Sequence, residues 1–366
     1  MKVKIARDKL VSLISKIQNI VAPKPAIPIL ANILLEAKEG QLILSATDLT
    51  VSMRLFAPAI IEEEGAITLP ARRFFQLVRE LTVPEVEIHA TTPEIAFLNA
   101  GSSHFKIHGM HKTEFPAFPD LNDGMHFEIQ SSILREMLGR TAFAAAKDDS
   151  RQVLNGILIQ YNNSSATFIG TDGKRLAKLE TTLDRPLSKS GNSILPLKAV
   201  EEIVRFLEVP DEKIEISLMS DKFSVETQNM LLVTKLLSGQ YPDVSRVIPL
   251  KKPEHLALHR EELITLLRQV SLFTSENSSS VRFVFTPGSL ELSATSGDIG
   301  EGKVSMPVNY QGPKLEIAFN PHYFLDVLRH SKDETVHFNV TDSYNPGLIT
   351  DSTSAQFVIM PMRLEV

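Results

Sequence analysis

The chain has 366 residues, of which 43% are hydrophobic, and it contains no Cys and no Trp. The lack of Cys excludes a disulfide framework and thiolate chemistry and fits a cytoplasmic location, and the N-terminus lacks the apolar core of a signal peptide. No run of about 18 apolar residues predicts a transmembrane helix, and the net charge of −6 argues mildly against a nucleic-acid partner.

Six amphipathic stretches predict helices, and two kinds of stretch alternate along the chain. The first kind follows a short strand and recurs at 4–17, 128–141 and 257–270, which places Leu10, Leu134 and Leu263 in register. The second kind starts at an apolar residue followed by Pro or Asn and recurs at 68–81, 194–207 and 318–331. Because the first turn of a helix leaves N–H groups unpaired, Pro70 and Pro196 suit these starts. A repeated order of this kind indicates one structural unit present three times.

The strands between these helices repeat as well. A strand is predicted at 31–37, 154–160 and 281–287, and the next strand ends in a tight turn near Thr47, Thr171 and Thr295, which are 124 residues apart. Alternation of apolar and polar residues, as at 165–170, is typical of a half-buried antiparallel sheet.

The repeats predict an α+β fold of three structurally similar domains, each with two helices and about six to eight short strands. We expect the domains at 1–122, 123–249 and 250–366, joined by polar, Pro-containing linkers at 116–125 and 249–254.

Charge is unevenly distributed between the predicted helices and the rest of the chain. The six helices hold 15 Lys and Arg against 8 Asp and Glu, so 23 basic and 36 acidic residues remain of the 38 and 44 in the chain. A basic face on an acidic protein indicates a polyanionic partner. The alternative is that these cations are ordinary solvated residues on surface helices.

One stretch, 297–304 (GDIGEGKV), nearly matches the phosphate-binding loop of nucleotide-binding proteins. Val304 occupies the position of the hydroxyl that would bind Mg²⁺, and the following residues are strand-like, so no helix start is available to receive a phosphate. We expect a hairpin loop here.

Other candidate catalytic or metal-binding residues are equally weak. His104, His108 and His111 lie near one another in sequence without a carboxylate-rich neighbourhood, and we expect a surface loop. Asp48 and Asp172 occupy equivalent turns in two repeats, so we expect them to bond their own backbone. The sequence therefore predicts no catalytic residue, no metal site and no cofactor.

Several motifs, in order along the whole chain, resemble the bacterial DNA polymerase III beta subunit, the sliding clamp. They are IPILANILLEA at 27–37, LPAR at 69–72, LNG at 154–156, TDGKRLA at 171–177, YPDVSRVIP at 241–249 and VIMPMRL at 358–364. Glu365 and Val366 extend beyond the usual end of the family.

The resemblance implies that two chains associate head to tail in a ring, with helices lining the inside and antiparallel sheets outside. It implies a junction in which Phe105 and Ile107 of one copy meet Leu272 and Phe273 of the other. The ring would encircle duplex DNA without reading its sequence, and Lys24, Arg73, Lys198 and Arg246 would face the DNA. Near Gln152 and Val153 this chain departs from relatives that carry aromatic residues able to touch single-stranded DNA, so that contact is not expected to carry over.

The resemblance also implies a groove that binds short linear motifs of the replicative polymerase, the clamp loader, translesion polymerases and repair proteins. Met adapts its shape, which suits a groove with many ligands. Lys174 varies in the family. The groove residues implied are Leu154, Thr171, Gly173, Lys174, Arg175, Leu176, Pro242, Val247, Asn320, Tyr323, Val358, Met360, Pro361, Met362 and Arg363.

Two alternatives to a processivity clamp stay open at this point. One is an enzyme acting on a sugar or nucleotide at a domain junction through the 297–304 loop, and the other is a repeat scaffold that binds only protein.

Overall fold

The structure is a computed structural model that describes the whole chain except residues 23, 122–123, 208–211, 250–255, 276–278 and 364–366. Part of the first predicted linker and nearly all of the second lie outside the described residues. No described helix has the length and apolar composition needed to cross a membrane.

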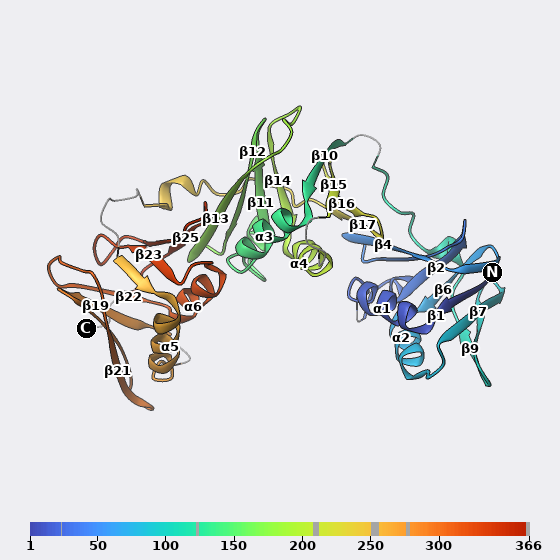
Figure 1. Cartoon of the computed structure of the whole chain (residues 1–366), viewed down its shortest axis with the longest axis horizontal. Coiled ribbons are helices and arrows are strands. Elements are labelled where there is room, and N and C mark those ends of the chain that lie inside the picture. The colour runs from blue at the N-terminus through green and yellow to red at the C-terminus, as the bar shows by residue number, and fades with distance from the viewer. Residues whose placement is uncertain (23, 122–123, 208–211, 250–255, 276–278, 364–366) are drawn as a thin grey trace. The chain divides into compact units, whose positions relative to one another are not determined.

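The described elements run three times through the same order (Figure 1). The first repeat contains β1 (Lys2–Ala6), α1 (Arg7–Ile17), β2 (Asn32–Lys38), β3 (Gln41–Thr47), β4 (Val51–Pro58), β5 (Ile60–Glu63), β6 (Gly65–Pro70), α2 (Ala71–Glu80), β7 (Glu85–Thr92), β8 (Ile95–Ala100) and β9 (Ser103–His108). The second contains β10 (Met125–Gln130), α3 (Ser131–Ala142), β11 (Gly156–Tyr161), β12 (Ser165–Thr171), β13 (Arg175–Thr182), β14 (Gly191–Pro196), α4 (Leu197–Phe206), β15 (Lys213–Leu218), β16 (Lys222–Thr227) and β17 (Met230–Lys235). The third contains β18 (Leu256–His259), α5 (Arg260–Ser271), β19 (Val281–Thr286), β20 (Ser289–Ser296), β21 (Gly300–Pro307), β22 (Leu315–Phe319), α6 (Pro321–His330), β23 (Thr335–Asn339), β24 (Gly347–Thr350) and β25 (Gln356–Ile359). Short 3₁₀ turns lie at Pro28–Ala31, Lys112–Glu114, Gln152–Asn155 and Ser245–Val247.

This order confirms the predicted threefold α+β architecture with two helices in each repeat. The first repeat has one strand more than predicted, because β5 adds to the pattern that the other two share. Leu10, Leu134 and Leu263, which the sequence placed in register, are at most 2% exposed.

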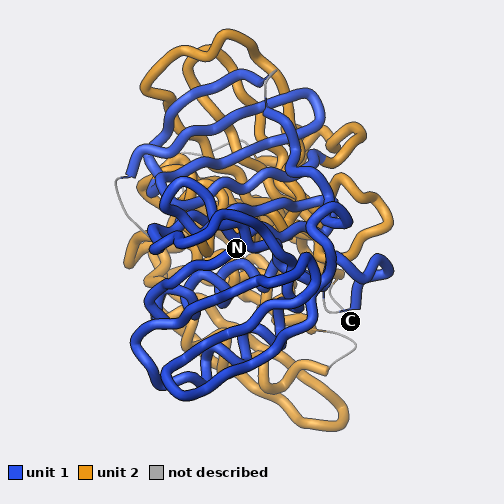
Figure 2. The backbone as a smooth tube through the Cα atoms, turned by 90° about the vertical axis from the view of Figure 1, so that its right-hand side faces the viewer, with its two compact units in different colours: residues 1–132, 207–236 blue, residues 133–206, 237–366 orange. Residues whose placement is uncertain are grey.

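Two compact units divide the described chain, residues 1–132 with 207–236 and residues 133–206 with 237–366 (Figure 2). The first unit holds a five-stranded sheet in the order β5-β1-β7-β8-β9 and an eight-stranded sheet in the order β10-β15-β16-β17-β4-β3-β2-β6. In the eight-stranded sheet β17 pairs with β4, so strands of the first and second repeats share one antiparallel ladder.

The second unit is built on the same plan. It holds an eight-stranded sheet in the order β14-β11-β12-β13-β25-β24-β23-β18 and a four-stranded sheet in the order β21-β20-β19-β22. Here β13 pairs with β25, which joins strands of the second and third repeats. The predicted domain boundaries remain predictions.

The helices bury one stripe and keep polar residues on the other. Helix α1 buries Leu10, Leu13, Ile14 and Ile17, and α5 buries Leu263, Ile264, Leu267 and Val270. Burying such side chains is worth about 1.5–3 kcal/mol each, which makes these stripes the main reason that the helices form.

The turn residues behave as predicted in both equivalent turns. Oδ1 of Asp48 accepts hydrogen bonds from the N–H groups of Thr50 (2.9 Å) and Val51 (2.7 Å). Oδ1 of Asp172 accepts from the N–H groups of Lys174 (2.9 Å) and Arg175 (3.0 Å). These carboxylates close turns through their own backbone.

The stretch 297–304 forms the predicted hairpin between β20 and β21, and Nζ of Lys303 pairs with Glu291 at 2.7 Å. Of the three histidines, His104 and His108 lie on β9 and not in a loop, because the edge strand extends through both. His111 begins a 3₁₀ turn, where its Nδ1 accepts from the N–H of Thr113.

Candidate functional site

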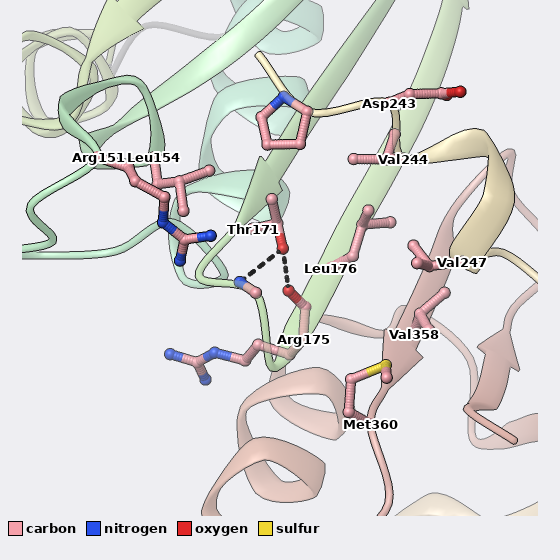
Figure 3. A pocket seen from close by; sticks show the side chains of 12 residues that line it. Arg151, Leu154, Thr171, Arg175, Leu176, Asp243, Val244, Val247, Val358 and Met360 are labelled. Atoms are coloured by element: carbon pink, nitrogen blue, oxygen red, sulfur yellow. Dashed lines mark hydrogen bonds between the residues drawn. The ribbon is translucent and has the colours of Figure 1, made fainter. Parts of the chain in front are cut away.

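The candidate site starts at the turn that joins β12 to β13 (Figure 3). Oγ1 of Thr171 donates to the carbonyl of Arg175 at 2.6 Å and accepts from the N–H of Gly173 at 3.1 Å. Gly173 has a φ of +83°, a conformation in which a side chain is strained. The sequence TDGKR therefore folds into a turn with a fixed shape.

An apolar floor lies beside this turn. Leu154, Leu176 and Val358 are each at most 2% exposed, and they belong to one buried cluster with Tyr241. Burial raises the pKa of the Tyr241 phenol, whose hydroxyl donates to the carbonyl of Ile169 at 3.4 Å. Tyr241 is therefore neutral and serves as part of the wall.

The end of the chain supplies the remaining wall, and two backbone hydrogen bonds hold it in place. The N–H of Met360 donates to the carbonyl of Lys174 at 2.9 Å, and the N–H of Met362 donates to the carbonyl of Ala318 at 2.7 Å. The segment from β25 to Met362 is thus attached to both β13 and β22 rather than fraying into solvent.

These parts enclose a cavity of about 150 Å³. Nine of the fifteen groove residues implied by the resemblance line it: Leu154, Thr171, Gly173, Arg175, Leu176, Pro242, Val247, Val358 and Met360. Six do not: Lys174, Asn320, Tyr323, Pro361, Met362 and Arg363. Three further residues line it that sequence reasoning missed: Arg151, Asp243 and Val244.

The missed residues had weak signals in the sequence. Asp243 and Val244 lie inside the YPDVSRVIP motif, between two residues that the resemblance implied. Arg151 precedes the LNG motif by three residues, and nothing in its local pattern predicts a contact with Gly173. In the structure the two residues are close: a Cβ atom placed on Gly173 would lie 3.4 Å from Nη2 of Arg151.

Two of the residues that do not line the cavity, Asn320 and Tyr323, belong to the start of α6. The side chain of Asn320 caps α6 by accepting from the N–H of His322 at 2.9 Å. The guanidinium of Arg175 lies 4.7 Å from the ring centre of Tyr323, and its Nη1 donates to Asp326 at 2.6 Å. Arg175 is therefore held between β13 and α6, and its charge is already paired.

The other charges at the cavity are also paired. Arg151 and Asp149 share hydrogen bonds of 2.8–3.1 Å, and the hydrogen bond from the Arg151 side chain lowers the pKa of the Asp149 carboxyl. Hydrogen bonds from Ser245 lower the pKa of the Asp243 carboxyl in the same way. The site therefore presents apolar walls with a neutralised rim.

Within the described residues, no group of three or more His, Asp or Glu side chains is placed to hold a metal ion. The arrangement suits reversible binding of apolar side chains, since apolar area is the main surface that it offers to a ligand.

Comparison with known proteins agrees with the repeats. Family profiles of the DNA polymerase III beta subunit match its N-terminal domain at residues 1–119, its central domain at 128–243 and its C-terminal domain at 245–363. The beta sliding clamp of Chlamydia muridarum is 51% identical over 364 residues, which cover 100% of this chain and 99% of the relative.

The chain belongs to the DNA polymerase III beta subunit family. The beta sliding clamp of Escherichia coli K12 is 30% identical over the full length of both chains. Among solved structures, the sliding clamp of Pseudomonas aeruginosa has a TM-score of 0.94 at 30% identity, and that of Bacillus subtilis has 0.95 at 26%, each covering 100% of both chains. This beta subunit is thus a sliding clamp and not itself a catalyst, and neither the enzyme nor the protein-only scaffold is favoured.

The cations predicted to face DNA are exposed in this beta subunit. Arg73 lies in the first turn of α2 and Lys198 in the first turn of α4, while Lys24 follows α1. Arg246 is 86% exposed and its Nε lies 3.3 Å from Asp243. Their role toward DNA stays a prediction.

The residues predicted at the junction between copies lie on the edge strand β9 and directly after helix α5. Phe105 and Ile107 are half-buried on β9, the last strand of its sheet. Leu272 is 71% exposed after α5, and the ring of Phe273 lies against Gly302 of β21. Their role in dimerisation also stays a prediction.

Proposed function

We propose that two copies of this chain form a closed ring that encircles duplex DNA and tethers the replicative polymerase to its template. The observation that supports this most strongly is the family match in all three repeats, at residues 1–119, 128–243 and 245–363. A ring cannot leave DNA without opening, yet it can slide, so the tethered polymerase gains processivity.

Retention on DNA of different topology tests this proposal. The chain has a mass of 40.7 kDa, and the dimer is expected at about twice that value in sedimentation. After loading by a clamp loader and ATP, it should stay on a nicked plasmid and be lost when the plasmid is linearised. Equal loss from both forms would refute the ring.

Sliding requires attraction to phosphates without base contacts, because a base contact would stop the movement. The excess of basic residues on the six helices supports this role, and so do the exposed positions of Lys24, Arg73, Lys198 and Arg246. The cavity would bind linear motifs rich in apolar side chains, with Met360, 37% exposed, as an adaptable wall.

A fluorescent peptide with two adjacent large apolar residues tests the cavity directly. The proposal expects saturable binding that Leu176→Ser abolishes, and an unchanged affinity in a variant with Leu49→Ser, an exposed residue of the first repeat. Partners would be the polymerase catalytic subunit, the clamp loader, translesion polymerases and repair proteins, all in the cytoplasm. Equal binding by both variants would place the peptide site elsewhere.

A further inference from the structure

Methionine supplies all the sulfur of this chain, which has ten Met and no Cys. All ten lie within the described residues. Met53, Met137, Met230 and Met306 are buried, and five others are half-buried. Met360 is the exposed one, with 37% of its surface open to solvent. We therefore expect an oxidant in solution to reach Met360 more readily than any other methionine.

Met360 lies at the edge of the peptide cavity, and its backbone is held in place there. Its N–H donates to the carbonyl of Lys174 at 2.9 Å. Together with Val247 and Val358, its side chain lines the apolar side of the cavity (Figure 3). A peptide side chain that enters the cavity would therefore cover the thioether of Met360 and exclude water from it.

The lining residues of the turn beside the cavity have donors that are already engaged. The hydroxyl of Thr171 donates to the carbonyl of Arg175 at 2.6 Å, and the N–H of Gly173 donates to that hydroxyl at 3.1 Å. The charge of Arg175 is paired with Asp326. An oxygen atom added to the sulfur of Met360 would therefore meet apolar groups and satisfied donors once a peptide covers it.

Oxidation of a thioether to a sulfoxide turns a flexible apolar side chain into a polar one. Burying a polar group under a ligand without a hydrogen bond is unfavourable. We propose that Met360 is a reversible oxidation site, and that its conversion to the sulfoxide releases the peptide from the cavity. This inference rests on the proposed role of the cavity as the peptide site, and it adds a modification that controls that role.

The reaction needs only a peroxide as co-reactant. The sulfur of Met360 attacks one oxygen of hydrogen peroxide, the O–O bond breaks as the S–O bond forms, and the other oxygen leaves as water. The sulfur loses two electrons and the peroxide gains them. A methionine sulfoxide reductase reverses the step with two electrons and two protons from a dithiol, and the oxygen leaves as water. Because the chain contains no Cys, a reversible loss of binding cannot come from a disulfide within it.

The free protein should tolerate the sulfoxide, because the first repeat has a polar residue at the equivalent position. There the N–H of Lys235 donates to the carbonyl of Thr50 at 2.9 Å, just as the N–H of Met360 donates to the carbonyl of Lys174. Lys235 is exposed, so this position accepts a polar side chain and keeps its backbone hydrogen bond. Since Met360 is exposed as well, its oxidation should change the affinity for peptide and not the stability of the chain.

Peroxide treatment of the full chain tests the proposal, with the fluorescent peptide of two adjacent large apolar residues as the probe. Mass spectrometry of proteolytic fragments should show the sulfoxide at Met360 before it appears at any other methionine. At a dose that oxidises Met360 alone, the affinity should fall at least about tenfold and the urea midpoint should stay unchanged. The two methionine sulfoxide reductases, one for each sulfoxide epimer, should restore the affinity, and dithiothreitol alone should not.

Two conservative variants separate Met360 from Met362, which is half-buried and does not line the cavity. Each protein is compared with itself before and after peroxide, so a change in its starting affinity does not enter the comparison. Met360→Leu should keep its own affinity after peroxide, whereas the matched control Met362→Leu should lose affinity as the unaltered chain does. Loss of affinity by peroxide-treated Met360→Leu would overturn the proposal.

Three other results would also overturn it: full affinity in a chain that carries the sulfoxide at Met360, oxidation of half-buried methionines before Met360, or a loss that the reductases do not reverse. A chain that fails to bind the peptide before any oxidation would instead refute the cavity as the peptide site. The failure of this inference and the failure of the proposed function are therefore distinguishable.

Discussion

Replacing Arg140 by Met should destabilise the second compact unit more than any exposed ion pair would. Arg140, on α3, is buried and donates to the carbonyl of His330 (2.8 Å), to Thr353 Oγ1 (3.0 Å) and to Glu136 (3.1 Å). It also forms an ion pair with Asp351, whose side chain is 0% exposed. A single guanidinium thus connects a helix of the second repeat with two segments of the third.

The size of the effect follows from what Met would leave behind. Removing one partner of a buried ion pair costs about 3–5 kcal/mol, because the remaining charge stays out of water without its partner. Asp351 would keep hydrogen bonds from the N–H groups of Lys332 and Thr353, both 3.0 Å, so we expect the lower end, about 3 kcal/mol. In a protein of marginal stability this is a large fraction of the total.

The same pair predicts how stability depends on pH. Burial raises the pKa of the Asp351 carboxyl, but hydrogen bonds from Thr353 and Lys332, with the charge of Arg140, outweigh it and hold the pKa below its ordinary value. A carboxyl whose pKa is lowered by folding contributes stability above its unfolded pKa, about 3.9, and loses it as pH falls through the folded pKa. Arg140→Met removes one cause of the lowering, so acid unfolding should begin at a higher pH.

Urea unfolding, followed by circular dichroism, measures the loss of stability caused by Arg140→Met. Hydrogen exchange in β23 to β25 gives a local measurement of the same loss. The control is Lys38→Met, which removes an ion pair with Glu39 in which both side chains are more than half exposed. The control should leave the midpoint unchanged. An Arg140→Met midpoint equal to that of the control would refute the reasoning.

Three further predictions concern the pocket and the helices. Gly173→Val should lower the free energy of unfolding by about 1–3 kcal/mol, because a φ of +83° is unfavourable for a β-branched residue. Thermal unfolding measures this loss, and an unchanged midpoint would contradict the described conformation of the turn. Met360→Lys should lower the affinity for an apolar peptide at least about tenfold, as measured by fluorescence anisotropy. Stability against urea should stay constant, because the Met360 side chain is 37% exposed in the free protein. Undiminished peptide binding would exclude Met360 from the site. Arg73→Ala combined with Lys198→Ala should reduce by about two the slope of the logarithm of the DNA-binding constant against the logarithm of the salt concentration. An unchanged slope would show that these two residues do not contact DNA phosphates.

The sequence by itself determined the repeated architecture of this protein. The helices start and end within a few residues of the predicted positions, and Leu10, Leu134 and Leu263 are buried as their spacing implied. The turn carboxylates Asp48 and Asp172 bond the backbone two and three residues ahead. Each of these features depends on neighbours within one or two turns of chain, so the local pattern of apolar and polar residues is sufficient to fix it.

Only the tertiary structure decided the composition of the pocket. Arg151, Leu176, Val247 and Met360 lie around one cavity because β13 pairs with β25, two strands separated by more than one hundred residues. The tertiary structure also pairs the charge of Arg175 with Asp326 on α6, so this lining residue presents no free charge to the cavity. Contacts of this range arise from which sheet edges meet and in which register, and a sequence pattern fixes which face of a strand is buried but not which strand lies beside it.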